Sequence, residues 1–125
     1  MPVSSQVIAT EPLGDLAREL IPENHCVEDA NYILDYFRRT ADGRILYGGG
    51  AVYGGLDPIS IEAKIRPNML KTFPQLKNAR IDFAWSGNFA LTLSRIPQIG
   101  RLTPNIYFSH GDSGHGVTTT QLLGR

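Results

Sequence analysis

Two runs of aromatic and β-branched residues, separated by a turn dipeptide, constrain most strongly what this chain can fold into. Residues 32–38 and 44–48 are rich in the side chains that strands prefer, and Asp42-Gly43 stands between them. Aspartate followed by glycine favours the tight primed turn of a β-hairpin, in which both central residues adopt positive φ. The sequence therefore predicts an antiparallel hairpin over residues 32–48.

Further strands are predicted on both sides of this hairpin, at residues 6–10, 80–86, 90–93 and 105–109. The strand at 80–86 alternates strictly, so Ile81, Phe83 and Trp85 share one side of a half-buried strand. Between the predicted strands the chain shows no regular strand–helix–strand alternation. We therefore expect an α+β fold, with a mainly antiparallel or mixed sheet and a few clustered helices.

Two helices are predicted before residue 80. Asp15 is expected to cap a short helix that ends before Pro22. Asp57-Pro58 is expected to start a second helix, whose apolar residues recur at helical spacing up to Phe73. Pro67 lies inside that pattern and lacks a backbone donor, so we expect a kink near Ile65 or two short helices with one buried side.

Composition narrows the class of protein. The 125 residues suffice for one core, 42% of them are hydrophobic, and the formal net charge is zero. These values favour a globular protein without nucleic-acid partners, and no apolar run approaches the roughly 18 residues of a membrane span. Residues 1–5 lack the pattern of a secretory signal, so we expect a cytoplasmic location. Cys26 is the single cysteine, and the three histidines have no metal-ligand spacing, so we expect no metal site.

The glycine-rich stretch near the C-terminus, GDSGHGV at residues 111–117, has two possible meanings. Ser113 could be the nucleophile of a serine hydrolase, although neither the histidine–aspartate partners nor a strand-to-helix elbow can be placed around it. Alternatively, the glycines join a strand to a helix that begins near Val117. A helix N-terminus carries unpaired N–H groups and partial positive charge, so this loop would cradle an anion or a developing negative charge.

The order of several motifs resembles the D-amino-acid oxidase superfamily of FAD-dependent amine oxidoreductases. The landmarks are DYFR at 35–38, DGRILYGGG at 42–50, FPQL at 73–76, WSG at 85–87, PQIGR at 97–101 and GDSGHGV at 111–117. The amino-acid sequence of residues 8–13 and 65–71 is similar to that of the gamma-glutamylputrescine oxidoreductase branch of the superfamily. The resemblance covers nearly the whole chain.

The resemblance implies a division of the chain and a set of flavin neighbours. Residues 1–100 would form the substrate-binding domain, and residues 101–125 would begin the return to the FAD-binding domain. The Rossmann half, with its Gly-x-Gly-x-x-Gly loop for the FAD pyrophosphate, has no counterpart in these 125 residues, so we expect a fragment of a longer protein. The implied cofactor-binding residues are Gly87, Gly111, Ser113, Gly114, His115, Gly116 and Val117.

The resemblance also implies an activity and its partners. The expected reaction is hydride transfer to flavin from gamma-glutamylputrescine or a similar amine, and no residue is assigned as the catalytic base. We expect this chain alone to be colourless and catalytically insufficient, because it lacks the FAD pyrophosphate contacts. We also expect self-association through the surface that the FAD half would cover. The alternatives are a stand-alone, non-catalytic domain for small-molecule binding or association, and a hydrolase that uses Ser113.

Overall fold

The computed structural model describes residues 1–124, so Arg125, the last residue of the predicted return segment, lies outside the description. Its centre is a five-stranded sheet in the order β2-β3-β4-β1-β5, and a separate two-stranded sheet pairs β6 with β7. The strands are β1 (Pro2–Thr10), β2 (Cys26–Glu28), β3 (Tyr36–Arg39), β4 (Ile45–Tyr53), β5 (Ile81–Ala90), β6 (Gln98–Thr103) and β7 (Ile106–His110). The helices are α1 (Asp15–Leu20), α2 (Ile61–Thr72), the 3-10 helix η1 (Pro74–Asn78) and α3 (Gly116–Leu123).

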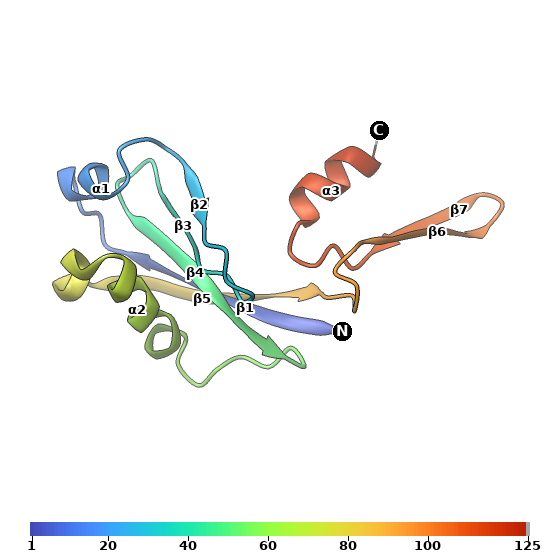
Figure 1. Ribbon diagram of the computed structural model, residues 1–125, viewed down its shortest axis with the longest axis horizontal. Helices are drawn as coiled ribbons and strands as arrows, with labels where there is room; N and C mark the ends of the chain where they lie inside the picture. The colour runs from blue at the N-terminus through green and yellow to red at the C-terminus, as the bar shows by residue number, and fades with distance from the viewer. Residues whose placement is uncertain (125) are drawn as a thin grey trace.

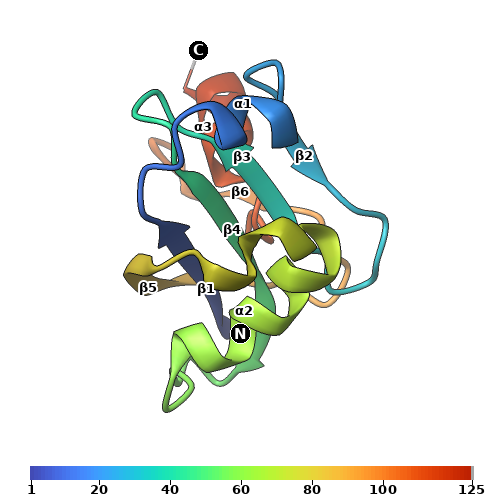
Figure 2. The ribbon, with the colours of Figure 1, turned by 90° about the vertical axis from the view of Figure 1, so that its left-hand side faces the viewer.

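Every strand pairing among the described residues is antiparallel, and the helices are few, so the predicted α+β fold is confirmed. Helix α2 lies across β1 and β4 and covers one face of the sheet (Figure 2). The β6–β7 hairpin and α3 stand apart from the five-stranded sheet, beyond the N-terminal end of β1 (Figure 1). The sheet therefore has one face covered by α2 and an opposite face that looks towards the C-terminal segment.

The core lies between α2 and the covered face of the sheet. Ile8 from β1 and Tyr47 from β4 are fully buried there, together with Ile65 and Met69 from α2. The ring of Phe73 packs edge-on against Tyr47, with ring centroids 6.4 Å apart. Burial of such side chains contributes about 1.5–3 kcal/mol each, so this layer holds the sheet in place.

The predicted hairpin forms, but its turn and its first strand differ from the prediction. The first strand begins at Tyr36 instead of residue 32, and residues 41–43 form a three-residue loop that is closed by the Thr40 N–H donating to the Arg44 carbonyl. Gly43 has φ of 77°, whereas Asp42 is not among the residues with positive φ. The predicted primed turn is therefore wrong, because only the glycine adopts the left-handed conformation, as in a three-residue hairpin loop.

The helix starts were also predicted incorrectly. Asp15 is the first residue of α1, and the cap position belongs to Gly14 without a side-chain hydrogen bond. Helix α2 begins at Ile61, because the Ser60 hydroxyl accepts a hydrogen bond from the Ala63 N–H and so caps it. Asp57 instead accepts a hydrogen bond from Ser4 Oγ at 2.7 Å.

Helix α2 runs as one element of 12 residues through Pro67, so of the two predicted alternatives, a kink or two short helices, the second is wrong. Two strands were missed or misplaced as well. Residues 90–93 are not a separate strand, because β5 ends at Ala90. Strand β6 escaped prediction, although the Pro104-Asn105 turn makes it the partner of the correctly expected β7.

In β5, Phe83 and Trp85 face away from the α2 core, whereas Ile81 packs against it. Phe83 is 56% exposed and Trp85 is 44% exposed, while Ala84 pairs with Ile8 on the covered face. The prediction that Ile81, Phe83 and Trp85 share one side is therefore wrong for Ile81, because the register shifts between Ala9 and Thr10 of the neighbouring strand. Small residues on the covered side of β5 leave the aromatic residues to form a wall on the opposite face.

Candidate functional site

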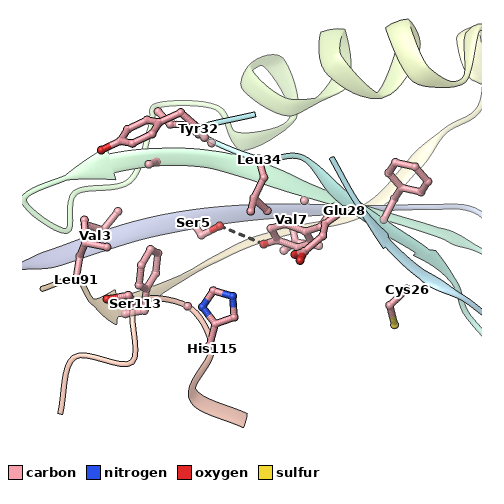
Figure 3. A pocket seen from close by; sticks show the side chains of 18 of the residues that line it. Val3, Ser5, Val7, Cys26, Glu28, Tyr32, Leu34, Leu91, Ser113 and His115 are labelled. Carbon is pink, nitrogen blue, oxygen red and sulfur yellow. Dashed lines mark hydrogen bonds between the residues drawn. The ribbon is translucent and has the colours of Figure 1, made fainter. Parts of the chain in front are cut away.

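The uncovered face of the five-stranded sheet forms one side of a cavity of about 800 Å³. Val7 and Trp85 are cross-strand partners on this face, and Val3 pairs with Phe89 in the same way. The C-terminal segment contributes Ser113, Gly114 and His115 to the same cavity. Figure 3 shows Ser113 and His115 on that segment, with Tyr32 and Leu34 reaching the cavity from the segment before β3.

Two glycines of β4, Gly48 and Gly49, allow side chains to pack closely against both faces of the sheet. A β-carbon on Gly48 would lie 2.2 Å from the ring of Tyr36, on the cavity side. A β-carbon on Gly49 would lie 2.2 Å from Asp35 Oδ1, on the α2 side. The hydroxyl of Tyr36 then forms a hydrogen bond of 3.1 Å with Ser5 Oγ, and Ser5 also lines the cavity.

Asp35 ties the segment before β3 to the core beneath it. Its carboxylate accepts hydrogen bonds from the Tyr47 hydroxyl at 3.1 Å and from Asn68 Nδ2 at 3.3 Å. Burial, together with the Asp35 carboxylate, raises the pKa of Tyr47 to about 12, against the effect of its hydrogen bond with Thr72. Tyr47 therefore stays protonated near neutral pH and serves as a structural donor.

The segment from residue 29 to residue 35 is a closed loop. The Asp29 N–H donates to the Asp35 carbonyl at 3.0 Å, and Asp29 Oδ1 accepts from the backbone N–H groups of Asn31 and Asp35. These hydrogen bonds, led by the one from Asn31, hold the pKa of Asp29 below its ordinary value. The loop presents Tyr32, Ile33 and Leu34 to the cavity.

The loop between β7 and α3 contains left-handed residues that shape its approach to the cavity. Gly111 and Gly114 have φ of 74° and 97°, and Ser113 has φ of 55°. A β-carbon on Gly111 would lie 2.2 Å from Thr92 Cγ2, whereas one on Gly114 would meet nothing within 4 Å. Gly111 is thus required by packing, and Gly114 leaves open space beside the cavity.

The predicted helix start near Val117 is confirmed, since α3 begins at Gly116 with His115 as its cap residue. The His115 carbonyl accepts from the Thr119 N–H, so the amides of Gly116, Val117 and Thr118 precede the first intrahelical hydrogen bond. They point out of the N-terminal end, where the partial positive charge of the helix lies. The Val117 side chain is 86% exposed.

Asp112 lies beside this helix end. Its Oδ2 would be 3.4 Å from a β-carbon on Gly116, so the carboxylate already offsets part of the positive charge there. Its Oδ1 is buried and has no hydrogen-bond partner among residues 1–124. A buried, unpaired carboxylate oxygen is costly, which favours a donor from outside the described residues.

The seven predicted cofactor residues divide into two locations. Six of them, Gly111 and residues 113–117, lie in the loop and first turn of α3. Gly87 lies in β5, where it pairs with Ser5 on the cavity face, and a β-carbon there would meet nothing within 4 Å. The fold thus brings residues 113–115 to the cavity, whereas Gly87 lies on the same face of the sheet, between Trp85 and Phe89, without being one of the residues that line the cavity.

The geometry does not favour the hydrolase interpretation. Ser113 Oγ donates to the Gly111 carbonyl at 3.1 Å and accepts from the Thr92 N–H at 3.3 Å. Among the described residues, none of its hydrogen bonds involves a histidine or a carboxylate. Because a serine nucleophile needs an adjacent general base, Ser113 acts here as a loop-forming residue.

Sequence reasoning missed the closed loop at residues 29–35 and the part of Arg95 in the cavity. The Asp29-x-Asn31 pattern was a usable signal, because aspartate side chains often bond to backbone amides two residues ahead. No sequence pattern indicated Arg95. Its backbone has a positive φ, which the residue type arginine gives no reason to expect. Within residues 1–124 no group of three or more histidine, cysteine or acidic residues could hold a metal, and no helix is long and apolar enough to cross a membrane.

Comparison with known proteins identifies the family of the chain. Residues 1–125 match the family described as DAO, FAD dependent oxidoreductase. The chain belongs to this family of FAD-dependent oxidoreductases.

Two curated relatives are similar in sequence over the whole chain. Gamma-glutamylputrescine oxidoreductase from Escherichia coli is 64% identical in sequence over the whole of this chain, which corresponds to 30% of that protein's length. The probable oxidoreductase OrdL from Haemophilus influenzae is 46% identical over the whole of this chain, which corresponds to 28% of that protein's length. The chain therefore spans less than a third of the length of these curated relatives.

Two solved structures share the fold. L-proline dehydrogenase from P. horikoshii superposes with a TM-score of 0.80 at 27% identity, over 98% of this chain and 33% of the other. Iminodiacetate oxidase from Chelativorans gives a TM-score of 0.78 at 17% identity, over 99% of this chain and 34% of the other. The second likeness concerns the fold alone.

Proposed function

We propose that this chain is the substrate-binding portion of an FAD-dependent amine oxidoreductase whose substrate is gamma-glutamylputrescine or a similar amine. The observation that carries the proposal is that the loop at residues 113–115 and the apolar face of the sheet border one cavity. Its volume, about 800 Å³, suits a small-molecule ligand. The relative named for oxidation of gamma-glutamylputrescine, 64% identical over the whole chain, supports the choice of substrate.

The residues that are present fit a flat aromatic ring. Gly87 and Gly114 leave open space where a β-carbon would stand, so a ring can approach the backbone closely at both positions. When bound, FAD would take up a hydride from the carbon that carries the amine. In the proposal the residues that hold it are Gly87, Gly111, Ser113, Gly114, His115, Gly116 and Val117.

The chain's own residues would supply positioning and electrostatics. Trp85, Phe89 and Leu46 form an apolar wall that excludes water from the reacting groups. The free amides at the start of α3 would stabilise negative charge on the cofactor, and Asp112 would moderate that effect. Preorganised dipoles of this kind act without reorganisation during the reaction. The positive φ angles of Gly111, Ser113 and Gly114 hold the loop in one conformation and so suit this role.

Exposed apolar side chains of the C-terminal part support the division at about residue 100. Ile99 and Leu102 on β6 are 59% and 69% exposed, and Leu122 on α3 is 73% exposed. In the proposal, residues 101–125 begin the return to an FAD-binding domain, which would cover these side chains. The same surface would drive self-association of this chain when that domain is absent. A cytoplasmic location is part of the proposal and fits the lone, unpaired Cys26.

A chimera tests the proposed function. Residues 1–125 would replace the matching segment of the Escherichia coli gamma-glutamylputrescine oxidoreductase, with the parent enzyme as the control. Because this chain would supply the whole substrate wall, we expect the chimera to oxidise gamma-glutamylputrescine with a kcat/KM within about tenfold of the parent value. Oxidation would be followed by reduction of the acceptor, with L-proline and iminodiacetate as comparison substrates.

Two results would contradict the proposal in different ways. A flavin-loaded chimera that oxidises L-proline but not gamma-glutamylputrescine would refute the assigned substrate. A folded chimera that takes up no flavin would refute the role of this chain and favour the stand-alone, non-catalytic domain. Labelling of Ser113 by a fluorophosphonate would instead revive the hydrolase interpretation.

A further inference from the structure

Arg95 lies at the rim of the cavity in a backbone conformation that glycine would adopt more easily. Its φ is 59°, and among the described residues only Ser113 shares a positive φ without being glycine. The turn is held by the Arg95 N–H, which donates to the Thr92 carbonyl at 3.3 Å, and by Thr92 Oγ1, which donates to the Ile96 carbonyl at 3.0 Å. Residues in such conformations cluster at ligand sites, so the contacts of the Arg95 side chain were compared with those of the other arginines.

The guanidinium of Arg95 lies over the ring of Tyr32. Its Cζ is 4.1 Å from the ring centroid, and Nη1 donates a long hydrogen bond of 3.5 Å to the Tyr32 carbonyl. Within residues 1–124 it takes part in no salt bridge, unlike Arg44, Arg66 and Arg80. Most of its five donors are therefore free to bind an anionic group.

Tyr32 is a firm support for this guanidinium. It stands on the closed loop that the Asp29–Asp35 backbone hydrogen bond ties together. Asp35 in turn is bonded to Tyr47 of the core and to Asn68 of α2. The ends of the loop that carries Tyr32 are thus tied to the sheet and α2, and the tyrosine itself is 76% exposed.

The surroundings of Arg95 favour a carboxylate. The cavity is mostly apolar, and Arg95 and Arg38 outnumber Glu28 among its charged lining residues in the described chain. Arg95 also borders a second cavity of about 550 Å³. An elongated ligand could therefore place its amine in the first cavity and its other end beside Arg95.

We propose that Arg95 is a specificity-determining residue that binds a carboxylate at the end of the substrate remote from the reacting amine, with Tyr32 as its positioning residue. This inference rests on the proposed function, because it assumes an amine substrate. It narrows the substrate class to amines that carry a distant carboxylate. The planar guanidinium can bind such a group through two parallel hydrogen bonds.

Binding can be measured on this chain through Trp85, its single tryptophan, which lines the same cavity. The probes are 6-aminohexanoate and hexylamine, which differ by the terminal carboxylate. We expect the wild-type chain to bind 6-aminohexanoate about tenfold more tightly than hexylamine, and Arg95→Gly to remove that preference. Because glycine relieves the left-handed strain, Arg95→Gly should also melt at a higher temperature than the wild type.

Two further variants make the test specific. Tyr32→Leu should reduce the ratio of the 6-aminohexanoate affinity to the hexylamine affinity, because the guanidinium loses the ring on which it stacks. Arg101→Met is the matched control: Arg101 also stacks on a tyrosine, with its Cζ 5.2 Å from the Tyr107 ring centroid, but it lines neither cavity. It should leave both affinities unchanged.

Equal affinity of the wild-type chain for the two probes would overturn the inference, and so would a preference that survives in Arg95→Gly. Since the titration uses no flavin, either failure leaves the proposed function to be judged by the chimera. Conversely, an inactive chimera with a carboxylate preference that depends on Arg95 would refute the oxidoreductase proposal and retain the binding site.

Discussion

Gly87→Val in the chimera is expected to lower the flavin content per protein at least tenfold and to abolish most amine oxidation. A β-carbon at Gly87 meets nothing within 4 Å of this chain, so valine would extend into the space that we assign to the flavin ring. Displacing a ring from a close backbone contact removes apolar contact and blocks the site sterically. The measurement is the visible flavin absorbance relative to protein, followed by turnover.

The control for this variant separates flavin binding from folding. In the 125-residue chain Gly87→Val should melt within a few degrees of the wild type, because valine favours strands and meets no neighbour. Ala84→Val, three residues earlier on the opposite face of β5, should keep its flavin in the chimera. Full flavin loading of the Gly87→Val chimera would show that no ring lies against this strand.

Gly49→Ala is expected to lower the free energy of unfolding of this chain by about 3 kcal/mol. Its β-carbon would lie 2.2 Å from Asp35 Oδ1 and 3.3 Å from the Leu34 carbonyl oxygen. The Asp35 carboxylate would have to move, which would leave the Tyr47 hydroxyl and Asn68 without this acceptor. Urea denaturation followed by circular dichroism measures the change.

Gly87→Ala is the matched control for this prediction, since both glycines lie in strands of the same sheet and neither has a positive φ. It should change the free energy of unfolding by less than about 0.5 kcal/mol. Equal losses for the two variants would mean that loss of glycine itself, and not the Asp35 contact, sets the stability of β4.

The sequence was informative where local patterns decide the structure. The aromatic and β-branched runs correctly predicted the hairpin of β3 and β4, and the glycine-rich stretch predicted a loop that leads into α3. The order of the motifs predicted the family, which the match over residues 1–125 confirms. These features depend on residue types at short spacing, so a single sequence carries them.

The remaining features depend on contacts between distant segments. Periodicity showed that Phe83 and Trp85 share a face, but only the position of α2 decides that this face is the uncovered one. Likewise, the roles of Gly48 and Gly49 depend on Tyr36 and Asp35, which approach from the neighbouring strand and the residue before it. The cavity joins residues from β1 to the loop before α3, and no local pattern predicts which of them meet.

The most direct test of the central claim is a crystal structure of the flavin-loaded chimera. We expect the flavin ring to lie against the uncovered face of the sheet, in contact with Gly87 of β5 and with the loop at residues 111–117. A ring bound elsewhere, with the apolar face of the sheet packed only against protein, would contradict it.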